Sequence, residues 1–397
     1  MGGPLEGIKV VEMGVWVAGP SCGAVLADWG ADVLKIEPPE GDPCRGLMAS
    51  LGVPVNPVFE QDNRGKRSMV LNLASAEAEA IAHRLVDEAD VFLTNMRPRA
   101  LEKYGLGYAA CAERNQRLVY CQVGGYGPDT SEANRASYDV GAFWSRAGVA
   151  LSLVPPGQDP PQQRGGMGDH MTGSNAAGAI AAALFARERT GEGQRVAVSL
   201  MRMGTYMMSW DLNARLRLQV ASEPYDRFHA VNPIINTFKA GDGKWFMLLL
   251  LQADRHWPDL MRALDAPELA DDPRLQDIPS RREHSVELVT ALDEIFAARS
   301  YAEWAAIFDR EDVWHAPMNT IDDVANDPLA SEAGVFVELE SPEGPVQQVA
   351  SPADFNRTPA KAGNWPPELG QHTEEVLLGM RYDWDAIIAM KERGAIP

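Results

Sequence analysis

The first two hundred residues alternate strand-like segments with helix-like ones. The strand-like segments are short and rich in β-branched residues: IKVVEM, DVLKIE, SMVLNL, DVFLTN, LVYCQVGGYG and QRVAVSL. Segments of helical character separate them, among them PSCGAVLADWG and AEAEAIAHRLVDEA. Alternation of this kind predicts a parallel sheet covered by helices, because each crossover must pass over a face of the sheet. We therefore predict a large Rossmann-like α/β domain whose N-terminal part is residues 1–225.

The pattern changes after residue 225. FKAGDGKWFMLLLL predicts two antiparallel strands joined by a Gly-Asp-Gly turn. Helical segments follow it: HWPDLMRALDA, SVELVTALDEIFAAR and YAEWAAIFDRE. We predict a smaller α+β domain for residues 226–325. Residues 326–397 hold the proline-rich GPVQQVASPADFNRTPAKAGNWPPELGQ, which predicts an extended return segment, and C-terminal helices that complete the large domain.

Charge and cysteine usage narrow the classes of partner. The chain has 36 Lys and Arg against 56 Asp and Glu, a formal charge of −20, which argues against nucleic acid or an anionic membrane as a partner. No run approaches 18 apolar residues, and MGGPLEGIKVVEMG does not resemble a signal peptide. The four cysteines have neither metal-ligand spacing nor a secreted framework. We expect a cytoplasmic protein that does not bind membranes.

The first strand–helix–strand unit invites comparison with dinucleotide-binding proteins. Such a site needs G-x-G-x-x-G after the first strand, whereas here Val15, Trp16 and Val17 stand where a pyrophosphate requires bare backbone. Glu37, at the end of the second strand, is then expected to have a structural or an adenosine-side role. The seven histidines are scattered, with no pair at helical ligand spacing beside an acid. We expect no metal and no permanently bound cofactor.

One acid stands out in RGGMGDHMTGS, residues 164–174, where Asp169 lies among small residues before the helical NAAGAIAAALFAR. An Asx turn or a helix N-cap would explain it, with a stabilisation of roughly 0.3–1 kcal/mol. Alternatively, a carboxylate with the ordinary pKa of about 3.9 is ionised at neutral pH and can attack an activated acyl group. Flanking glycines would let backbone N–H groups approach the oxyanion. The local sequence does not decide between a cap and a nucleophile.

The wider pattern resembles the class III CoA-transferases, the family of formyl-CoA and carnitine CoA-transferases. The resemblance begins with LEGIKVVEMGVWVAGPSCGAVLADWGADVLKIEPPEGDPCRG and continues, in order, with NRGKRSMVLNL, ADVFLTNMRPRALEKYGL, RTGEGQRVAVSL, NPIINTFKAGDGKW, PELADDPRLQ, HAPMNTIDDVANDP, ASPADFNRTPA and LGQHTEEVL. Gly168-Asp169 matches the position of that family's nucleophile. The resemblance implies transfer of CoA from an acyl-CoA to a carboxylic acid through aspartyl anhydride and aspartyl-CoA thioester intermediates.

The resemblance also implies an interlocked homodimer and CoA contacts at matching positions. These contacts are Val15, Trp16, Val17, Ala18, Leu71, Asn95, Met96, Arg97 and Lys103, with Tyr138 and Asp139 orienting the acyl group or the pantetheine. Arg64, Lys66 and Arg67 form a local basic cluster that could attract an anionic cofactor.

Two departures from the family bear on the substrate. Val17 stands where formyl-CoA transferase has a glutamine, and RFHAVNPIIN replaces its glycine-rich lid. Both disfavour formate or oxalate. Trp16, Phe143 and Trp144 favour a larger acyl group, and we expect a branched, aromatic or dicarboxylic acid.

Two alternative functions remain. The α-methylacyl-CoA racemase type uses the same aspartate as one of two bases, with a histidine of a G-H-D motif as the other. Here ASYDVGAFW places Tyr138 at that position, and a tyrosine hydroxyl is a poor base at neutral pH. A non-catalytic acyl-CoA-binding protein would need the CoA contacts without a competent nucleophile.

Overall fold

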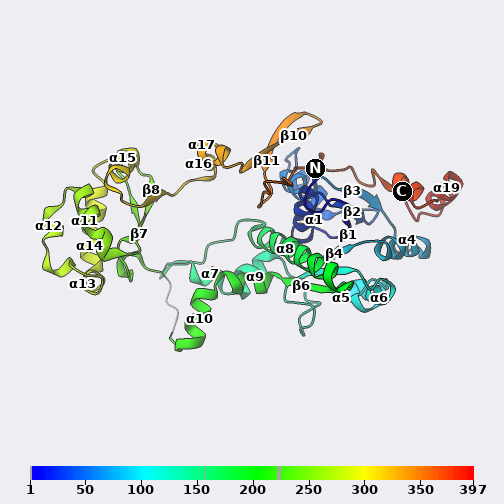
Figure 1. Ribbon diagram of the computed structural model, residues 1–397, viewed down its shortest axis with the longest axis horizontal. Coiled ribbons are helices and arrows are strands. Elements are labelled where there is room, and N and C mark those ends of the chain that lie inside the picture. The colour runs from blue at the N-terminus through cyan, green and yellow to red at the C-terminus, as the bar shows by residue number, and fades with distance from the viewer. Residues whose placement is uncertain (1, 156, 221–224) are drawn as a thin grey trace. The chain divides into compact units, whose positions relative to one another are not determined.

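The computed structural model describes residues 2–155, 157–220 and 225–397. The chain forms two compact units (Figure 1). The first unit comprises Met1–Leu151, Pro161–Ala221 and Ala333–Pro397, and the second comprises Ser152–Pro160 and Ser222–Glu332. No helix in the described part of the chain combines the length and the apolar character that a bilayer crossing needs.

A six-stranded sheet is the centre of the first unit, with the strand order β3-β2-β1-β4-β5-β6. All five pairings are parallel, which confirms the predicted α/β class. The strands are β1 Lys9–Met13, β2 Asp32–Glu37, β3 Arg67–Val70, β4 Val91–Thr94, β5 Val119–Gly124 and β6 Arg195–Ser199. The order reverses direction between β1 and β4, so the connections of these two neighbours leave toward opposite sides and a crevice opens at their carboxyl ends.

Helices cover both faces of this sheet, and β1 shows why. Val11 packs on one face with residues of α4, α18 and α19, whereas Val10 packs on the other with residues of α1 and α8. The sequences of strands that are buried on both faces are nearly continuous apolar runs, and the strands of this sheet have such sequences. The helices of this unit are α1 Ala18–Asp28, α2 Leu47–Ser50, α3 Pro57–Asn63, α4 Ala76–Asp87, α5 Pro98–Lys103, α6 Tyr108–Arg114, α7 Val149–Ser152, α8 Met167–Thr190, α9 Leu200–Met207, α10 Ser209–Leu218, α18 Thr373–Gly379 and α19 Trp384–Glu392.

The long helix α8 packs closely against α1. A Cβ at Gly173 would lie 2.9 Å from the carbonyl oxygen of Ala18, so only glycine allows this approach. Gly166 (φ +78°) and Gly191 (φ +78°) flank α8, and their left-handed backbone begins and ends it.

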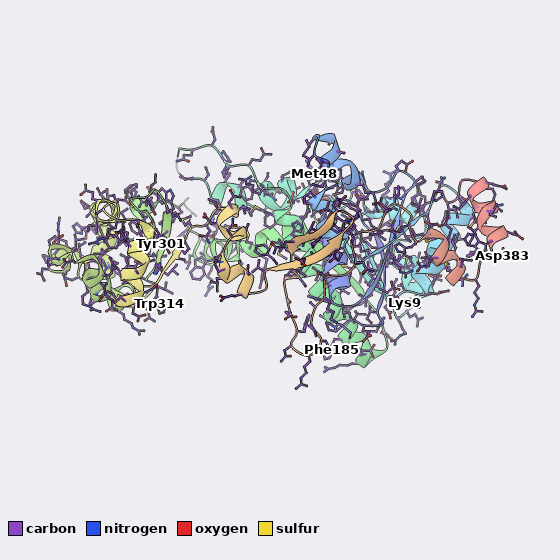
Figure 2. All side chains as sticks on the ribbon, turned by 90° about the horizontal axis from the view of Figure 1, so that it is seen from above. Lys9, Met48, Phe185, Tyr301, Trp314 and Asp383 are labelled. Carbon is purple, nitrogen blue, oxygen red and sulfur yellow. The ribbon has the colours of Figure 1, made fainter. Side chains whose placement is uncertain are left out.

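Lys9 at the start of β1 and the exposed Phe185 of α8 are both labelled in Figure 2.

The second unit has a three-stranded antiparallel sheet in the order β7-β8-β9. The predicted hairpin is present, with Phe238 opposite Phe246, and β9 is an addition that the sequence did not indicate. The elements are β7 Ile235–Lys239, β8 Trp245–Leu249, β9 His315–Pro317, α11 Ala253–Leu264, α12 Pro267–Ala270, α13 Ile278–Glu283, α14 Ser285–Phe296, α15 Tyr301–Glu311, α16 Ile321–Ala325 and α17 Pro328–Glu332. Figure 2 labels Tyr301 at the start of α15 and Trp314 just before β9.

The last part of the chain contains one hairpin that the sequence analysis did not predict. Phe336–Ser341 (β10) and Gly344–Val349 (β11) pair in antiparallel register. Residues 350–372 then run without helix or strand along the first unit. The backbone N–H of Gly65 donates to the carbonyl of Asn364 at 2.7 Å, and Trp29 Nε1 donates to Ser351 Oγ at 3.0 Å.

Candidate active site

A cavity of about 370 Å³ lies at the carboxyl ends of β1, β4 and β5. Residues that follow these strands line it, together with residues from the 133–138 segment, Asp169 of α8 and Leu200 of α9. This is the point at which the strand order reverses, where open α/β sheets bind their ligands. The sheet topology thus brings segments that are far apart in sequence to one wall.

The turn after β1 is held in an unusual conformation. Trp16 has φ +63°, in the left-handed region that bulky residues rarely adopt, so other contacts must compensate for its strain. Asp42 Oδ1 accepts a hydrogen bond from the backbone N–H of Trp16 at 3.0 Å. Asn95 Oδ1 accepts a hydrogen bond from the N–H of Val15 at 2.9 Å, and Asn95 Nδ2 donates one to the carbonyl of Val15 at 2.7 Å. Side chains from two other segments therefore fix this turn.

A fully buried ion network lies beneath the turn. Lys35 Nζ lies 3.0 Å from Glu12 Oε1 and 2.9 Å from Asp42 Oδ2, and it donates to the carbonyl of Gly14 at 2.8 Å. Lys66 Nζ pairs with the other oxygen of Glu12 at 2.7 Å. Burial alone would raise the pKa of Glu12, but the charges of Lys66 and Lys35 hold it below its ordinary value. The carboxylate of Glu12 therefore stays charged in the core.

The three cations of the predicted basic cluster are each paired with an acidic side chain of the chain itself. Arg64 Nη2 lies 2.7 Å from Asp28 Oδ2, Lys66 is committed to Glu12, and Arg67 pairs with Asp32 at 2.7 Å. Arg64 and Lys66 are also buried. None of the three lines the cavity. Glu37 has a structural role, since its oxygens accept from Arg45 and from Ser68 at 2.7 Å.

Asp169 is the third residue of α8. The N-cap position is held by Gly166, so the N-cap explanation of this acid is wrong. Gly168 must be small because a Cβ there would lie 2.5 Å from Cγ of Phe143. Asp169, the next residue, lines the cavity. Within the described residues its carboxylate accepts no hydrogen bond, which leaves its lone pairs available.

The ionisation of Asp169 differs from the sequence-based expectation. Burial raises the pKa of this carboxyl to about 7, and the neighbouring charge of Asp139 adds to the increase. At neutral pH, the free protein therefore contains both the protonated and the ionised form of Asp169. An ordinary aspartate would be almost fully ionised there, as we expected from the sequence. A carboxyl with so displaced a pKa is a mark of a functional site.

His170 and Asp62 form an ion pair next to Asp169. Nε2 of His170 lies 3.0 Å from Oδ1 of Asp62, which is buried on α3, whereas the imidazole is half-exposed. The hydrogen bond and the charge of Asp62 raise the pKa of His170. Asp62 was not identified from the sequence, because 108 residues separate it from His170 and no local pattern connects them.

Most of the predicted contact residues meet at the cavity. Those that line it, together with Asp169, are Val15, Trp16, Ala18, Asn95, Met96, Arg97 and Tyr138. The ring of Tyr138 lies edge-on to that of Trp16, with 6.0 Å between the ring centroids. The guanidinium of Arg97, exposed at the rim, has no ion-pair partner in the described part of the chain, so it is available to an anionic ligand.

Other predicted residues do not line the cavity. Val17 is buried at the start of α1, Leu71 is 1% exposed in the core, and Lys103 lies with Nζ 5.1 Å above the ring of Tyr104. Asp139 is buried, and its Oδ2 accepts from Gln163 Nε2 at 2.6 Å and from the N–H of Gly168 at 3.3 Å. Asp139 thus fixes the start of α8 through its hydrogen bond to the N–H of Gly168.

Phe143 and Trp144, which the sequence analysis associated with a larger acyl group, do not line the cavity. Both are buried with α9 residues in a separate apolar cluster. The glycines at the end of β5 line the cavity, and they were not identified from the sequence either. A Cβ at Gly125 would lie 3.0 Å from Cβ of Ser137, so this glycine lets the 133–138 segment approach.

Comparisons with known proteins agree over nearly the whole chain. A model of CoA-transferase family III matches residues 5–373. (R)-2-hydroxy-4-methylpentanoate CoA-transferase of Clostridioides difficile is 32% identical over 394 residues, covering 98% of this chain and 98% of the relative. Cinnamoyl-CoA:phenyllactate CoA-transferase of Clostridium sporogenes is 32% identical, covering 95% and 93%. The crystal structure of a CaiB/BaiF family protein from Brucella suis superposes with a TM-score of 0.83 at 29% identity, covering 96% and 100%.

Proposed function

Because the chain belongs to the family III CoA-transferases, we propose that Asp169 is its nucleophile and that the cavity beside Asp169 binds the acyl-CoA. The observation that carries this proposal is the free carboxylate of Asp169 on the wall of a cavity at the reversal point of the sheet. The raised pKa of Asp169 supports it, since displaced pKa values cluster where chemistry occurs.

The proposed reaction has two half-reactions. The ionised carboxylate of Asp169 attacks the thioester carbonyl of the donor, a C–O bond forms, the C–S bond breaks, and CoA leaves as a thiolate. The thiolate then attacks the aspartyl carbonyl of this mixed anhydride, which releases the donor acid and leaves an aspartyl-CoA thioester. An acceptor carboxylate attacks that thioester, and the expelled thiolate takes the new acyl group from the second anhydride. This last step restores the carboxylate of Asp169.

The position of Asp169 suits this chemistry. It lies in the first turn of a 24-residue helix, where the dipole and the free N–H groups stabilise negative charge on a reacting oxygen. Asp139, through Gln163 and the N–H of Gly168, fixes that first turn. The nucleophile therefore stays in place while charge moves between carboxylate, oxyanion and thiolate.

For the CoA end of the substrate, we propose that Arg97 binds a phosphate and that the Val15–Ala18 turn contacts the nucleotide or the pantetheine. The unpaired guanidinium at the cavity rim and the fixed turn support this assignment. Leu71, Lys103 and Asp139 remain predicted CoA contacts by resemblance alone.

We propose a branched or aromatic carboxylic acid as the acyl group. Trp16 and Tyr138 offer apolar ring surface on the cavity wall. The two relatives described above act, by their names, on a branched 2-hydroxy acid and on an aromatic acid. A dicarboxylic acid is the alternative, since a succinate–glutarate CoA-transferase of Agrobacterium fabrum is 31% identical.

We also propose a cytoplasmic, interlocked homodimer. Helices α9 and α10 support a covered surface, because Tyr206, Trp210 and Leu216 are between 71% and 88% exposed in the single chain. Large apolar side chains exposed on consecutive helices support an interaction surface there. Analytical ultracentrifugation should give twice the mass of one chain.

A trapping experiment tests the proposed nucleophile. The protein is incubated with 4-methylpentanoyl-, cinnamoyl- and glutaryl-CoA, quenched with hydroxylamine and digested, and the peptide holding Asp169 is examined by mass spectrometry. We expect a hydroxamate on Asp169 with at least one donor. Asp169→Ala should bind CoA normally and give no hydroxamate or transfer. Exchange of the α-proton for deuterium without a hydroxamate would instead support racemase-type proton transfer.

A further inference from the structure

Three carboxylates meet around the first turn of α8, those of Asp62, Asp139 and Asp169. The charges of Asp139 and Asp62 both raise the pKa of Asp169, since like charges disfavour one another's ionised form. Asp139 is satisfied by Gln163 and by the N–H of Gly168. Asp62 is 1% exposed, and within the described residues its Oδ2 has no hydrogen-bond partner. The chain therefore concentrates negative charge where its nucleophile must ionise.

His170 is the cation whose charge lowers the pKa of Asp169. Its Nε2 lies 3.0 Å from Asp62 Oδ1, and its sequence neighbour is Asp169. Lys66 and Lys35 also act on Asp62 through their charge, but both are committed to Glu12, and Lys35 is committed to Asp42 as well. His170 is therefore the group that balances charge at Asp169.

The imidazole of His170 is held in place. A Cβ at Gly166 would lie 3.0 Å from both Cε1 and Nδ1 of the ring, so the ring lies closely over this glycine. The backbone N–H of His170 donates to the carbonyl of Gly166 at 2.8 Å. With Asp62 on Nε2 and Gly166 beneath the ring, the charge has a fixed position relative to Asp169.

We propose that His170, held by the buried carboxylate of Asp62, is a positioning residue that keeps Asp169 ionised for attack. The role of Asp169 in this statement rests on the proposed function. Asp62 raises the pKa of His170, and the charge of His170 in turn lowers the pKa of Asp169 against the effect of burial. Because the imidazole is half-exposed, solvent screens the coupling, and we expect shifts of about 0.5 to 1 pH unit.

The ion pair can be tested without any substrate. The chain has seven histidines, and the imidazole signals of histidine-labelled protein can be titrated by NMR, with His170→Gln assigning the relevant one. We expect His170 to titrate above 6.5 and its midpoint to fall by about 0.5 to 1 unit in Asp62→Asn. Asp169→Asn should lower it by a smaller amount, and this variant does not alter the buried Asp62. Unchanged midpoints in both variants would overturn the proposal.

The consequence for the nucleophile is tested by the pH dependence of hydroxamate formation on Asp169. His170→Gln should lower the rate about three- to tenfold at pH 6 relative to the unaltered protein, and less than twofold at pH 9. The reason is that the pH below which Asp169 becomes protonated, and the rate falls, moves upward when the charge of His170 is removed. His170→Arg, which introduces a permanent positive charge, should restore the rate at pH 6. His83→Gln is the matched control, because His83 bonds the carbonyl of Tyr104 and does not line the cavity.

The two tests separate this inference from the proposed function. A loss of rate that is equal at every pH would show that His170 has only a structural role, and would overturn the inference. If the unaltered protein forms no hydroxamate, the proposed function fails. The NMR titration still decides whether Asp62, His170 and Asp169 are coupled.

Discussion

Asn95 holds both polar groups of Val15, accepting from its N–H at 2.9 Å and donating to its carbonyl at 2.7 Å. The two residues follow neighbouring parallel strands, β4 and β1, and lie 80 positions apart. The amide of Asn95 therefore fixes the turn on one wall of the cavity.

We expect Asn95→Ala to weaken CoA binding about tenfold, because the two lost hydrogen bonds release the strained Trp16 turn. Isothermal titration with CoA measures this effect. Asn326→Ala is the control, since among the described residues that side chain bonds the carbonyl of Asp322, on the helix that Asn326 ends. Equal affinities in the two variants would contradict a role of Asn95 in shaping the site.

The buried network beneath the turn predicts a large loss of stability on Lys35→Met. Removing one partner of a buried ion pair costs about 3–5 kcal/mol, because a charge is left uncompensated. Here Asp42 loses its cation, and Asp42 also holds the N–H of Trp16. Calorimetry should show a fall in unfolding temperature of about 4–6 °C. Lys391→Met removes the exposed pair with Glu374 and should have a much smaller effect.

Two glycines of α8 predict opposite effects of the same substitution. Gly168→Ala would place a Cβ 2.5 Å from Cγ of Phe143, and overpacking of this kind costs about 1–3 kcal/mol. Asp169 is the next residue, so transfer should slow as well. Gly178→Ala meets nothing within 4 Å on an exposed face, and it should stabilise the helix by about 0.5–1 kcal/mol. Urea unfolding of both variants measures the difference, and a stabilising Gly168→Ala would contradict the packing described above.

Arg97 predicts how CoA binding depends on salt. If its guanidinium binds a phosphate, Arg97→Ala should raise the Kd for CoA about tenfold at low salt, and the difference should shrink at 0.5 M salt. Arg99→Ala is the matched control, because this neighbouring arginine does not line the cavity. A loss of affinity that is the same at all salt concentrations would indicate a role in packing instead.

Much of the fold could be predicted from the sequence because its signals are local. The apolar runs around Val10, Val33 and Val91 and the glycine-terminated helix after Asp169 are visible along the chain, and all correspond to observed elements. The hairpin of residues 336–349 was not predicted. Its strands carry Pro345, two adjacent glutamines and two acids. Alternation of apolar and polar residues is confined to the four residues 337–340 and does not continue in β11, so the signal is too short to mark a hairpin.

The candidate site could be predicted only where one short segment carries the signal. Asp169 and the Val15–Ala18 turn were identified in this way, together with their family resemblance. Asp62 and Asp42 could not be, because their significance lies in partners that the fold brings from elsewhere. The raised pKa of Asp169 follows from burial and from Asp139, neither of which is legible in GMGDHM. The run of basic residues also led to a wrong expectation of an exposed charged cluster, since Arg64 and Lys66 are buried in the interior.

The raised pKa of Asp169 predicts how stability depends on pH. In the folded state this carboxyl has a pKa of about 7 against an ordinary value of 3.8, so the folded protein binds more protons than the unfolded chain between these limits. The contribution of Asp169 to the free energy of unfolding therefore falls as pH rises from about 4 to 7, and it stays low above that range.

Asp169→Asn removes the ionisation and should stabilise the protein by about 2–4 kcal/mol at pH 8, with little effect at pH 4. Urea unfolding at the two pH values measures the difference. Asp159→Asn, at an exposed position of the second unit, should change neither value. If Asp169→Asn has the same effect at pH 4 and pH 8, then burial does not displace the ionisation of this carboxyl. Asp169 would then be fully charged at neutral pH without help from His170.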